Sequence, residues 1–321
     1  MILWEHVNMA EISSVDLDAI LSGDPEELGV HLHLVERDVE IDGHKVSVYC
    51  HCLTTDANAK VKVKRLVEFM RHAAADYAIP RSRIEEARKR DIKFKSTAAV
   101  AALHDKARAV FTDLAQTGEG GEMLLFLLAE RFLKLPHVLC KMDLKTDSRM
   151  HYHGADGVYA AVADDGRLKL YWGESKVYQD PTDAIRDCLK SLAPFLAEED
   201  HKGASRERDL VLLSDKADLG DPRLSDAFRR YFDTTSPLSN RVEYCGIALV
   251  GFDADFYGPG DGRVVLDDMV KAAKSGMENW LKSVGRRLAA EKLEHFDIHF
   301  FCLPLPSVDD FRKAFLEVMG H

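Results

Sequence analysis

Apolar and polar residues alternate along residues 29–36 and 44–52, on either side of the sequence Ile41-Asp42-Gly43-His44. A period of two is typical of half-buried strands, and Asp-Gly favours a tight turn, so this region predicts a β-hairpin. From residue 59 the spacing of the apolar residues becomes that of helices. It predicts three helices, at 59–77, 81–90 and 97–114.

The second half of the chain predicts helices that alternate with strands. The helices are expected at 121–134, 182–197, 223–232, 264–291 and 307–319, and the strands at 138–145, 155–163, 168–178, 242–251 and 296–303. Polar residues 198–208 predict a mobile connection. The pattern as a whole predicts an α/β fold in which helices flank a mixed central sheet.

A boundary near residues 91–96 is expected to divide the chain into two domains. The first, 1–94, would be an α+β domain that holds the hairpin and a basic helical segment. The second, 95–321, would hold the alternating strands and helices and the candidate chemistry.

Two of the predicted strands form a hairpin whose register decides which charged side chains meet. A two-residue turn would place Asp156 opposite Ser175. A three-residue turn over Asp164-Asp165-Gly166 would place Asp156 opposite Glu174. Asp and Gly suit the longer turn, because Gly adopts a positive φ without strain. We therefore expect Asp156 and Glu174 to face each other, with Lys176 on the same face as Glu174.

Asp156, Glu174 and Lys176 together suit the hydrolysis of a phosphodiester. Two carboxylates about 4 to 5 Å apart across a strand pair repel each other, so such a pair either holds a proton or binds a cation. Oxygen ligands favour Mg²⁺, or Mn²⁺. The metal would polarise the phosphate and activate a water, and Lys176 would orient that water or balance charge in the transition state.

Glu174-Ser175-Lys176 is weak support by itself, because Glu-x-Lys should occur by chance about once in 300 residues and mostly on solvated strand edges. Leu170 and Trp172 mark this strand as largely buried, however, and charges on a buried strand need a reason. A candidate third acid, Glu122, lies in the first turn of a predicted helix. An acid there either complements the helix dipole or delivers a third carboxylate to the sheet.

The order of these residues, a helix Glu followed by Asp and then Glu-x-Lys on adjacent strands, resembles the PD-(D/E)XK nuclease superfamily. Three segments also look like the HamA family, the nuclease subunit of the Hachiman antiphage defence system. They are Gly121-Glu-Met-Leu-Leu-Phe126, His153-Gly-Ala-Asp-Gly-Val158 and Tyr171-Trp-Gly-Glu-Ser-Lys-Val-Tyr178. The resemblance covers mainly residues 95–321. Gly154-Ala155-Asp156 stands in place of a Pro-Asp pair.

The resemblance implies a restriction-endonuclease-like core with a mixed sheet. It implies a metal site made by Asp156, Glu174 and Glu122, with Lys176 as a further catalytic residue. It also implies a DNA nuclease that works with a helicase partner, HamB, and acts when phage infection or damaged DNA activates the complex. Gly258-Pro-Gly-Asp-Gly262 lacks the Lys-Ser/Thr of a P-loop, so any ATP-driven step is expected from another chain.

The net charge of −11 opposes DNA binding, because affinity for phosphates comes mostly from Lys and Arg. The charge is unevenly distributed, since residues 60–95 hold twelve Lys and Arg and five acids. This segment predicts a DNA contact, although a solvated helical face and a contact with a partner protein are alternatives. The residues expected at DNA are Lys60, Lys62, Lys64, Arg65, Arg88, Lys89 and Arg90.

The sequence shows no apolar run long enough to span a membrane, and its first residues lack the basic and apolar regions of a signal peptide. Its six cysteines are scattered and suit a reducing compartment. We therefore expect a cytoplasmic protein without membrane contact.

Two classes of function stay open. The first is a Mg²⁺-dependent DNA endonuclease that uses Asp156, Glu174, Lys176 and Glu122, either as an antiviral effector or in DNA repair. The second is a nuclease-like scaffold that binds and regulates a helicase. The complete set of Asp, Glu and Lys favours the first, because a disused site would tolerate the loss of at least one of them.

Overall fold

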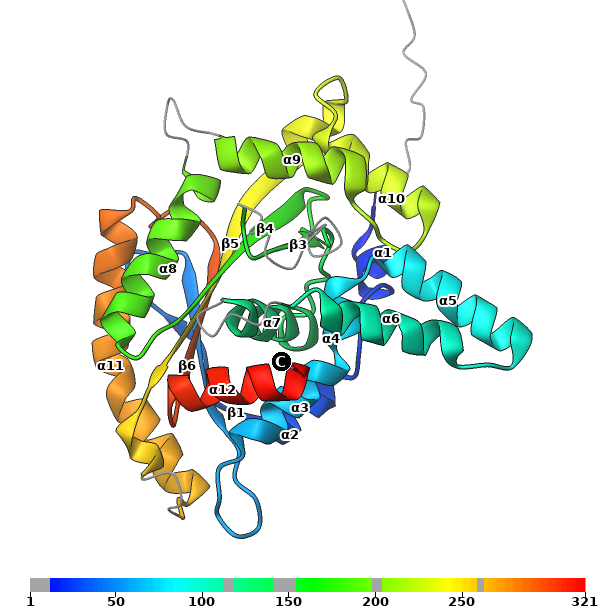
Figure 1. Cartoon of the computed structure of the whole chain (residues 1–321). Helices are drawn as coiled ribbons and strands as arrows, with labels where there is room; N and C mark the ends of the chain where they lie inside the picture. The colour runs from blue at the N-terminus through cyan, green and yellow to red at the C-terminus, as the bar shows by residue number, and fades with distance from the viewer. Residues whose placement is uncertain (1–11, 112–117, 141–153, 198–203, 259–262, 321) are drawn as a thin grey trace, which may run out of the picture.

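The structure is a computed structural model that describes residues 12–111, 118–140, 154–197, 204–258 and 263–320 (Figure 1). Its centre is a six-stranded sheet in the order β1-β2-β6-β5-β4-β3. The strands are β1 (Leu32–Glu40), β2 (Val46–Leu53), β3 (Gly157–Val162), β4 (Leu168–Val177), β5 (Val242–Asp253) and β6 (Ile298–Leu305). The four inner strands run parallel to one another, and the edge strands β1 and β3 are antiparallel to their neighbours. The predicted mixed α/β sheet is confirmed.

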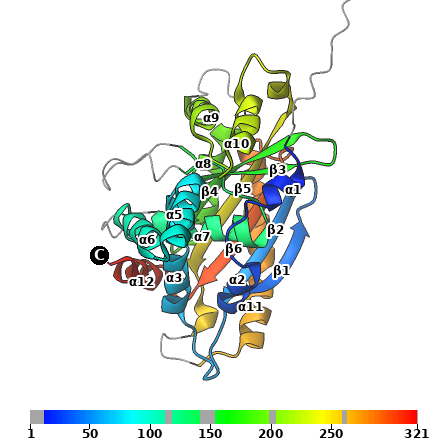
Figure 2. The ribbon, with the colours of Figure 1, turned by 90° about the vertical axis from the view of Figure 1, so that its right-hand side faces the viewer.

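Helices cover both faces of the sheet (Figures 1 and 2). On one face lie α8 (Pro181–Leu196) and α11 (Leu266–Ala290). On the other face α7 lies against β4 and β5, and it is itself covered by further helices. These elements are α3 (Val63–His72), α4 (Ala74–Ala78), α7 (Glu119–Leu127) and α12 (Val308–Met319).

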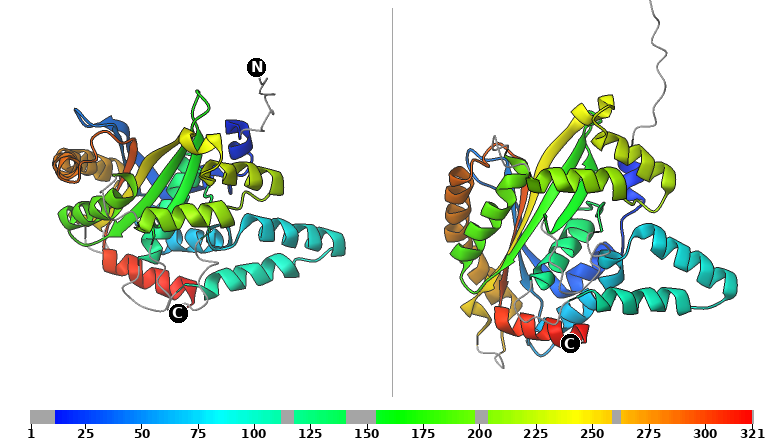
Figure 3. Two further views of the ribbon diagram at one scale, coloured as in Figure 1. Left: turned by 90° about the horizontal axis from the view of Figure 1, so that it is seen from above. Right: turned by 45° about the horizontal axis from the view of Figure 1, so that its top comes forward.

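The remaining elements lie around this core. Two short helices lie near the N-terminus, α1 (Ser14–Asp18) and α2 (Pro25–His31). Between α8 and β5 the chain forms α9 (Ala204–Lys216), α10 (Pro222–Arg229), η3 (Arg230–Phe232) and η4 (Pro237–Arg241). The short helix η5 (Asp255–Tyr257) follows β5. Two helices, α5 (Arg81–Phe94) and α6 (Ala98–Ala109), form an antiparallel pair that projects from the body (Figure 3).

Helix α7 packs closely on both sides because two glycines remove side chains from its first turn. A Cβ on Gly121 would lie 3.0 Å from Val177 of β4, and one on Gly120 would lie 3.0 Å from the Phe311 ring of α12. From Met123 to Leu127, α7 is apolar and buried. The helix is therefore fixed between the sheet and α12, and this fixes where Glu122 points.

A buried acid holds the continuation of α7 in place. Helix α7 leads directly into a π-helical turn, η1 (Leu128–Phe132), which contains Glu130. The Glu130 carboxylate accepts hydrogen bonds from the backbone N–H groups of Ser22 at 3.1 Å and His137 at 2.7 Å, and it pairs with Arg81 at the start of α5. A buried carboxylate needs several donors, and these contacts supply them. Glu130 thus ties the N-terminal segment and α5 to the central helix.

The register predicted for the β3–β4 hairpin is confirmed. Gly157 pairs with Gly173, so the numbers of facing residues sum to 330, as the three-residue turn requires. The Gly166 N–H donates to the Ala163 carbonyl at 2.8 Å, and Gly166 has a φ of 76°. The Asp-Asp-Gly sequence therefore sets which residues of β3 and β4 face each other.

Four expectations differ from the structure. Residues 138–140 do not form part of a strand, since only His137 bridges to Tyr159, and residues 141–145 lie outside the described residues. The helix expected at 59–77 is two shorter helices, because Ala73 ends α3 and begins α4. The polar stretch 198–208 was expected to be a mobile connection, yet its part from Ala204 onward begins α9. Of residues 97–114, the helix covers 98–109.

The two halves of the chain contribute strands to the same sheet. Strand β2, which precedes residue 94, pairs in parallel with β6, and the predicted boundary falls at the turn between α5 and α6. The division into two domains stays a prediction. No helix in the described ranges is both long and apolar enough to cross a bilayer.

We expect Gly166→Ala to lower the free energy of unfolding by about 1 to 2 kcal/mol, because alanine resists the left-handed conformation of this turn. Urea denaturation followed by circular dichroism measures the change. Gly29→Ala is the matched control: a Cβ there meets no atom within 4 Å, and the residue lies inside α2, so alanine should not destabilise the protein. Equal stability of Gly166→Ala and the unsubstituted protein would contradict the proposed role of the turn.

Candidate active site

Asp156 lies immediately before β3, and its carboxylate closes the end of the β3–β4 ladder. Regular pairing would bring the Ser175 N–H to the backbone carbonyl of residue 155, because the hydrogen-bonded pairs of this hairpin are the odd-numbered ones. Instead, Asp156 Oδ2 accepts from Ser175 N at 2.8 Å and from Ser175 Oγ at 2.7 Å. The backbone N–H of Asp156 donates to the Gly173 carbonyl at 2.8 Å. Asp156 is therefore held by both its backbone and its side chain.

A buried acid on α9 fixes the residue before Asp156. Asp209 is fully buried, and its Oδ2 accepts from the backbone N–H of Ala155 at 3.2 Å. The segment that was expected to be a mobile connection thus leads into a helix that supports the candidate site. Nothing in the pattern of residues 204–216 indicates this contact, because it joins residues 54 positions apart.

Glu174 and Lys176 lie on the face of β4 that α8 covers. Side chains alternate along a strand, and Trp172, two residues before Glu174, stacks on Phe195 of α8 with ring centroids 5.3 Å apart. The intervening Ser175 lies on the α7 face, beside Gly121. Asp156 is thus opposite Glu174 in register, as predicted, but its hydrogen-bonded oxygen turns to Ser175 and not to a position shared with Glu174.

Glu174 is a buried acid with one cationic neighbour. Its residue is 4% exposed, and Lys176 Nζ donates to Glu174 Oε2 at 3.2 Å. Burial above all, and then the charge of Asp156, raise the pKa of Glu174 well above its usual value. Burial by itself lowers the pKa of Lys176, but the charges of Glu174 and Asp156 outweigh this effect and raise it. The ionised form of Glu174 is therefore costly in this environment, and additional positive charge close by would favour it.

Glu122 reaches the site from the first turn of α7 and is held by a tyrosine. The Tyr77 hydroxyl, buried on α4, donates to Glu122 Oε2 at 2.9 Å. The Tyr77 ring stacks on His137, with centroids 6.0 Å apart. Burial and the charge of Glu122 raise the pKa of Tyr77, so its hydroxyl keeps its proton and acts as the donor. Tyr77 lies within the first 94 residues, and it was not among the predicted site residues.

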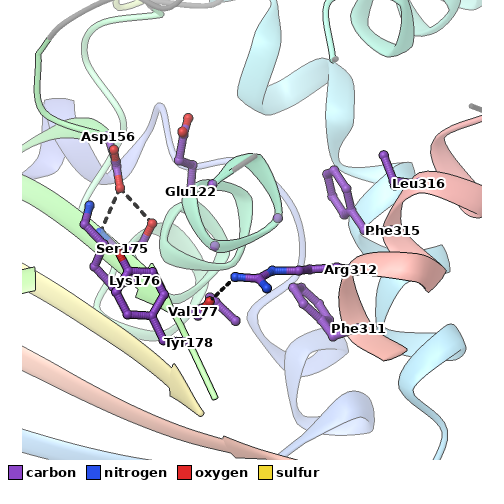
Figure 4. Close-up of a pocket in the computed structure, with 13 residues that line it drawn as sticks. Glu122, Asp156, Ser175, Lys176, Val177, Tyr178, Phe311, Arg312, Phe315 and Leu316 are labelled. Atoms are coloured by element: carbon purple, nitrogen blue, oxygen red, sulfur yellow. Dashed lines mark hydrogen bonds between the residues drawn. The ribbon is translucent and has the colours of Figure 1, made fainter. Parts of the chain in front are cut away.

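A cavity of about 230 Å³ joins most of these groups (Figure 4). Its wall includes Glu122, Asp156, Ser175, Lys176, Phe311 and Arg312. Glu174 does not line it, but Lys176 both lines the cavity and bonds to Glu174. Figure 4 shows Arg312 reaching from α12 to the end of β4, where it donates to the Val177 carbonyl at 2.7 Å.

The structure therefore brings together Glu122, Asp156 and Lys176 around one cavity and places Glu174 behind Lys176. Within the described ranges, no group of three or more His, Cys, Asp or Glu side chains is arranged to hold a metal ion. The donors present suit a hard cation that takes one or two carboxylates and completes its shell with water and phosphate oxygens. Glu122, Asp156 and Glu174 as metal ligands stay a prediction.

Four residues at the site were not indicated by the sequence, and three of them hold another site residue in place. Ser175 and Asp209 hold Asp156 and the residue before it, Tyr77 holds Glu122, and Arg312 adds positive charge to the cavity wall. A Ser between Glu and Lys and an Arg on a helix are too common to stand out in a sequence.

The basic residues expected at DNA fall into two separate places. Lys60, Lys62, Lys64 and Arg65 lie at or just before the start of α3, where Lys62 pairs with Asp56 at 3.2 Å. Arg88, Lys89 and Arg90 lie exposed on the projecting α5 (Figure 1). The segment is therefore not one continuous basic face, and a contact of either part with DNA stays a prediction.

The family model of HamA matches residues 30–319, which is nearly the whole chain. A search of curated proteins finds no match.

We expect Glu174→Gln to gain stability relative to the unsubstituted protein as the pH rises. A raised pKa means that the folded state keeps a proton that the unfolded state releases above about 4.5, the ordinary value. The carboxyl of Glu174 therefore lowers stability increasingly as the pH rises from 4.5 through the raised pKa, and glutamine removes this loss. Thermal unfolding in a chelator across this range measures it.

Glu278→Gln is the matched control, because Glu278 also pairs with a lysine but is exposed and has a lowered pKa. Its stability difference should be small and of the opposite sign. A difference for Glu174→Gln that does not change with pH would show that Glu174 is ionised in the folded protein without a metal.

Proposed function

The chain belongs to the HamA family, and from this membership together with the geometry of the site we propose that it is a metal-dependent DNA nuclease. Membership of the family indicates a part in Hachiman defence. The proposed reaction is the hydrolysis of phosphodiester bonds, with the chain as the effector of the defence complex.

The observation that carries the proposal is the buried Glu174–Lys176 pair beside the charge of Asp156. A buried carboxyl whose pKa is raised is costly to ionise on a central strand, and a bound cation would offset that cost. The neighbouring cavity is open to solvent and lined by two further acids and two cations, Glu122, Asp156, Lys176 and Arg312. Acids and cations that line the same cavity suit a phosphodiester held against a divalent metal.

We also propose that the centre of the fold is a PD-(D/E)XK core. Its support is the order and adjacency of three elements: α7 carries Glu122, Asp156 precedes β3, and Glu174 and Lys176 lie on the neighbouring β4. This is the order in which the superfamily carries its acids and its lysine.

Mg²⁺, or Mn²⁺, fits the oxygen-only donors of the site and would be held by Asp156 and Glu174, with Glu122 as a further acid. When bound, the metal would polarise the phosphate and supply an activated water. Lys176 Nζ, which lies between Glu174 and the cavity, orients that water or balances charge as the phosphate oxygens become more negative. Tyr77 keeps the Glu122 carboxylate at the cavity wall.

The proposed partners are DNA and a helicase subunit of the HamB type. The excess of acids in the chain disfavours unassisted DNA binding. We therefore propose that the nuclease acts when the helicase subunit delivers DNA to it.

A cleavage assay tests the catalytic assignment. The chain is incubated with plasmid DNA and Mg²⁺, with and without the helicase subunit, and Glu174→Gln and Lys176→Met should each lower the cleavage rate about 100-fold or more. The exposed pair Glu278→Gln and Lys282→Met on α11 is the matched control and should cleave normally. Cleavage unchanged by the first two substitutions refutes the assignment. No cleavage under any condition, with intact binding to the helicase subunit, would support a scaffold instead.

We expect Tyr77→Phe to raise the Mg²⁺ concentration needed for half-maximal cleavage by about tenfold, because a hydrogen bond to a charged group is worth about 1.5 to 3 kcal/mol. Tyr159→Phe is the matched control: Tyr159 is also buried beside His137, but its hydroxyl has no hydrogen-bond partner among the described residues. A purely structural role of Tyr77 would lower the yield of folded protein without changing the metal dependence.

A further inference from the structure

The helices α5 and α6 form an arm that carries a basic surface away from the rest of the chain. The fourteen residues of α5 span about 21 Å at 1.5 Å per residue. Figures 1 and 3 show the arm projecting beyond the other helices. Its root lies close to the site, because Tyr77 of α4 precedes it directly. We call residues 88–95, at the far end of α5, the arm tip.

The arm tip holds five cations, namely Arg88, Lys89, Arg90, Lys93 and Lys95. All five are exposed. Arg88 pairs with Glu85 at 2.7 Å, but the other four have no acidic partner among the residues that the structure describes. The chain as a whole has a net charge of −11, so this local excess of positive charge is opposite in sign to the net charge of the chain.

The one acid of the arm tip is used inside the arm. Asp91 is buried, and its carboxylate accepts from the backbone N–H groups of Ala99 at 3.0 Å and Val100 at 2.9 Å, in the first turn of α6. It thus caps α6, whose own N-cap residue makes no side-chain hydrogen bond. The carboxylate faces a helix N-terminus, so its charge is offset within the arm. The charged side chains that the arm tip presents to solvent are therefore all cations, on a turn that Asp91 fixes.

Two large apolar side chains lie among these cations. Ile92 is 79% exposed and Phe94 is 66% exposed, and Lys93 Nζ lies 5.3 Å from the centroid of the Phe94 ring. The sequence Ile92-Lys93-Phe94-Lys95 separates the two apolar residues by lysines. A surface that docks on a protein has an apolar centre from which lysine is depleted, and the arm tip has no such centre.

We propose that the arm tip binds DNA that has unpaired bases, with Lys89, Arg90 and Lys93 on backbone phosphates and the Phe94 ring stacked on a base. A ring flanked by cations is the arrangement by which single strands are bound without sequence preference. We choose DNA as the ligand because of charge complementarity: the charged side chains of this projecting surface are all positive, and DNA is a polyanion. This inference rests on the proposed function in one respect, which is that the nucleic acid is DNA.

The cations are tested by binding, in a chelator so that no strand is cut. The complete chain carrying Lys89→Gln, Arg90→Gln and Lys93→Gln should bind a fluorescent single strand about tenfold more weakly, measured by anisotropy. The slope of log affinity against log salt should fall by about 2, because each lost phosphate contact removes about 0.7. The matched control, Lys271→Gln, Lys282→Gln and Arg286→Gln on the exposed side of α11, should change neither.

The ring is tested separately from the charge. Phe94→Leu keeps an apolar side chain but removes the stacking surface, so it should weaken binding of the single strand about fivefold or more and leave binding of a blunt duplex unchanged. Unchanged binding of the single strand by both sets of variants overturns the proposal, and loss of the helicase subunit by the same variants would then assign the arm tip to protein docking. Because these measurements need no cleavage, an inactive nuclease would leave their outcome intact.

Discussion

Strand β4 is paired on both sides, with antiparallel β3 and parallel β5, and every group of the candidate site depends on the register that this double pairing fixes. Because successive side chains point to opposite faces, a shift of one residue would move Glu174 and Lys176 to the α7 face and Ser175 to the α8 face. The shift would also push the larger side chain of Glu174 against Gly121, where even a Cβ on the glycine would meet β4 at 3.0 Å. The register of β4 therefore determines both how closely α7 packs on the sheet and on which face the charged side chains lie.

Within that constraint the charges occupy two layers that meet at Lys176. Glu122, Asp156 and Arg312 border the cavity on the α7 and α12 side. Glu174 is enclosed on the α8 side, and Lys176 extends from its partner Glu174 to the cavity wall. Glu130 is a buried acid of the same protein that has more partners, because it accepts from backbone N–H groups and pairs with Arg81. Among the residues that the structure describes, Glu174 has only Lys176 as a side-chain partner, and burial, followed by the charge of Asp156, raises its pKa.

The parts of the site that could be predicted from the sequence are those set by local chemistry. The Asp164-Asp165-Gly166 turn fixes the hairpin register within a few residues, and the apolar run after Glu122 fixes the helix that carries it. The bond from Asp156 to Ser175 was not predictable, because it replaces a regular ladder bond at the point where the pairing ends. Asp209 and Tyr77 act across 54 and 45 positions, and no local pattern reports such contacts. The basic segment was visible as composition, but its division between α3 and a projecting arm depends on packing.

The burial of Glu174 also bears on how such a site persists over generations. Proteins lie close to the minimum stability they need, and substitutions that add stability are common and usually tolerated. A neutral residue at position 174 would relieve the desolvation of a buried carboxyl, so selection for folding alone would favour losing the charge. An exposed acid differs in this respect, because water already solvates its carboxylate and a neutral residue would relieve no desolvation. Glu174 is therefore a position where mutational drift favours a neutral side chain, and a chain that has the carboxyl there has it at a cost in stability.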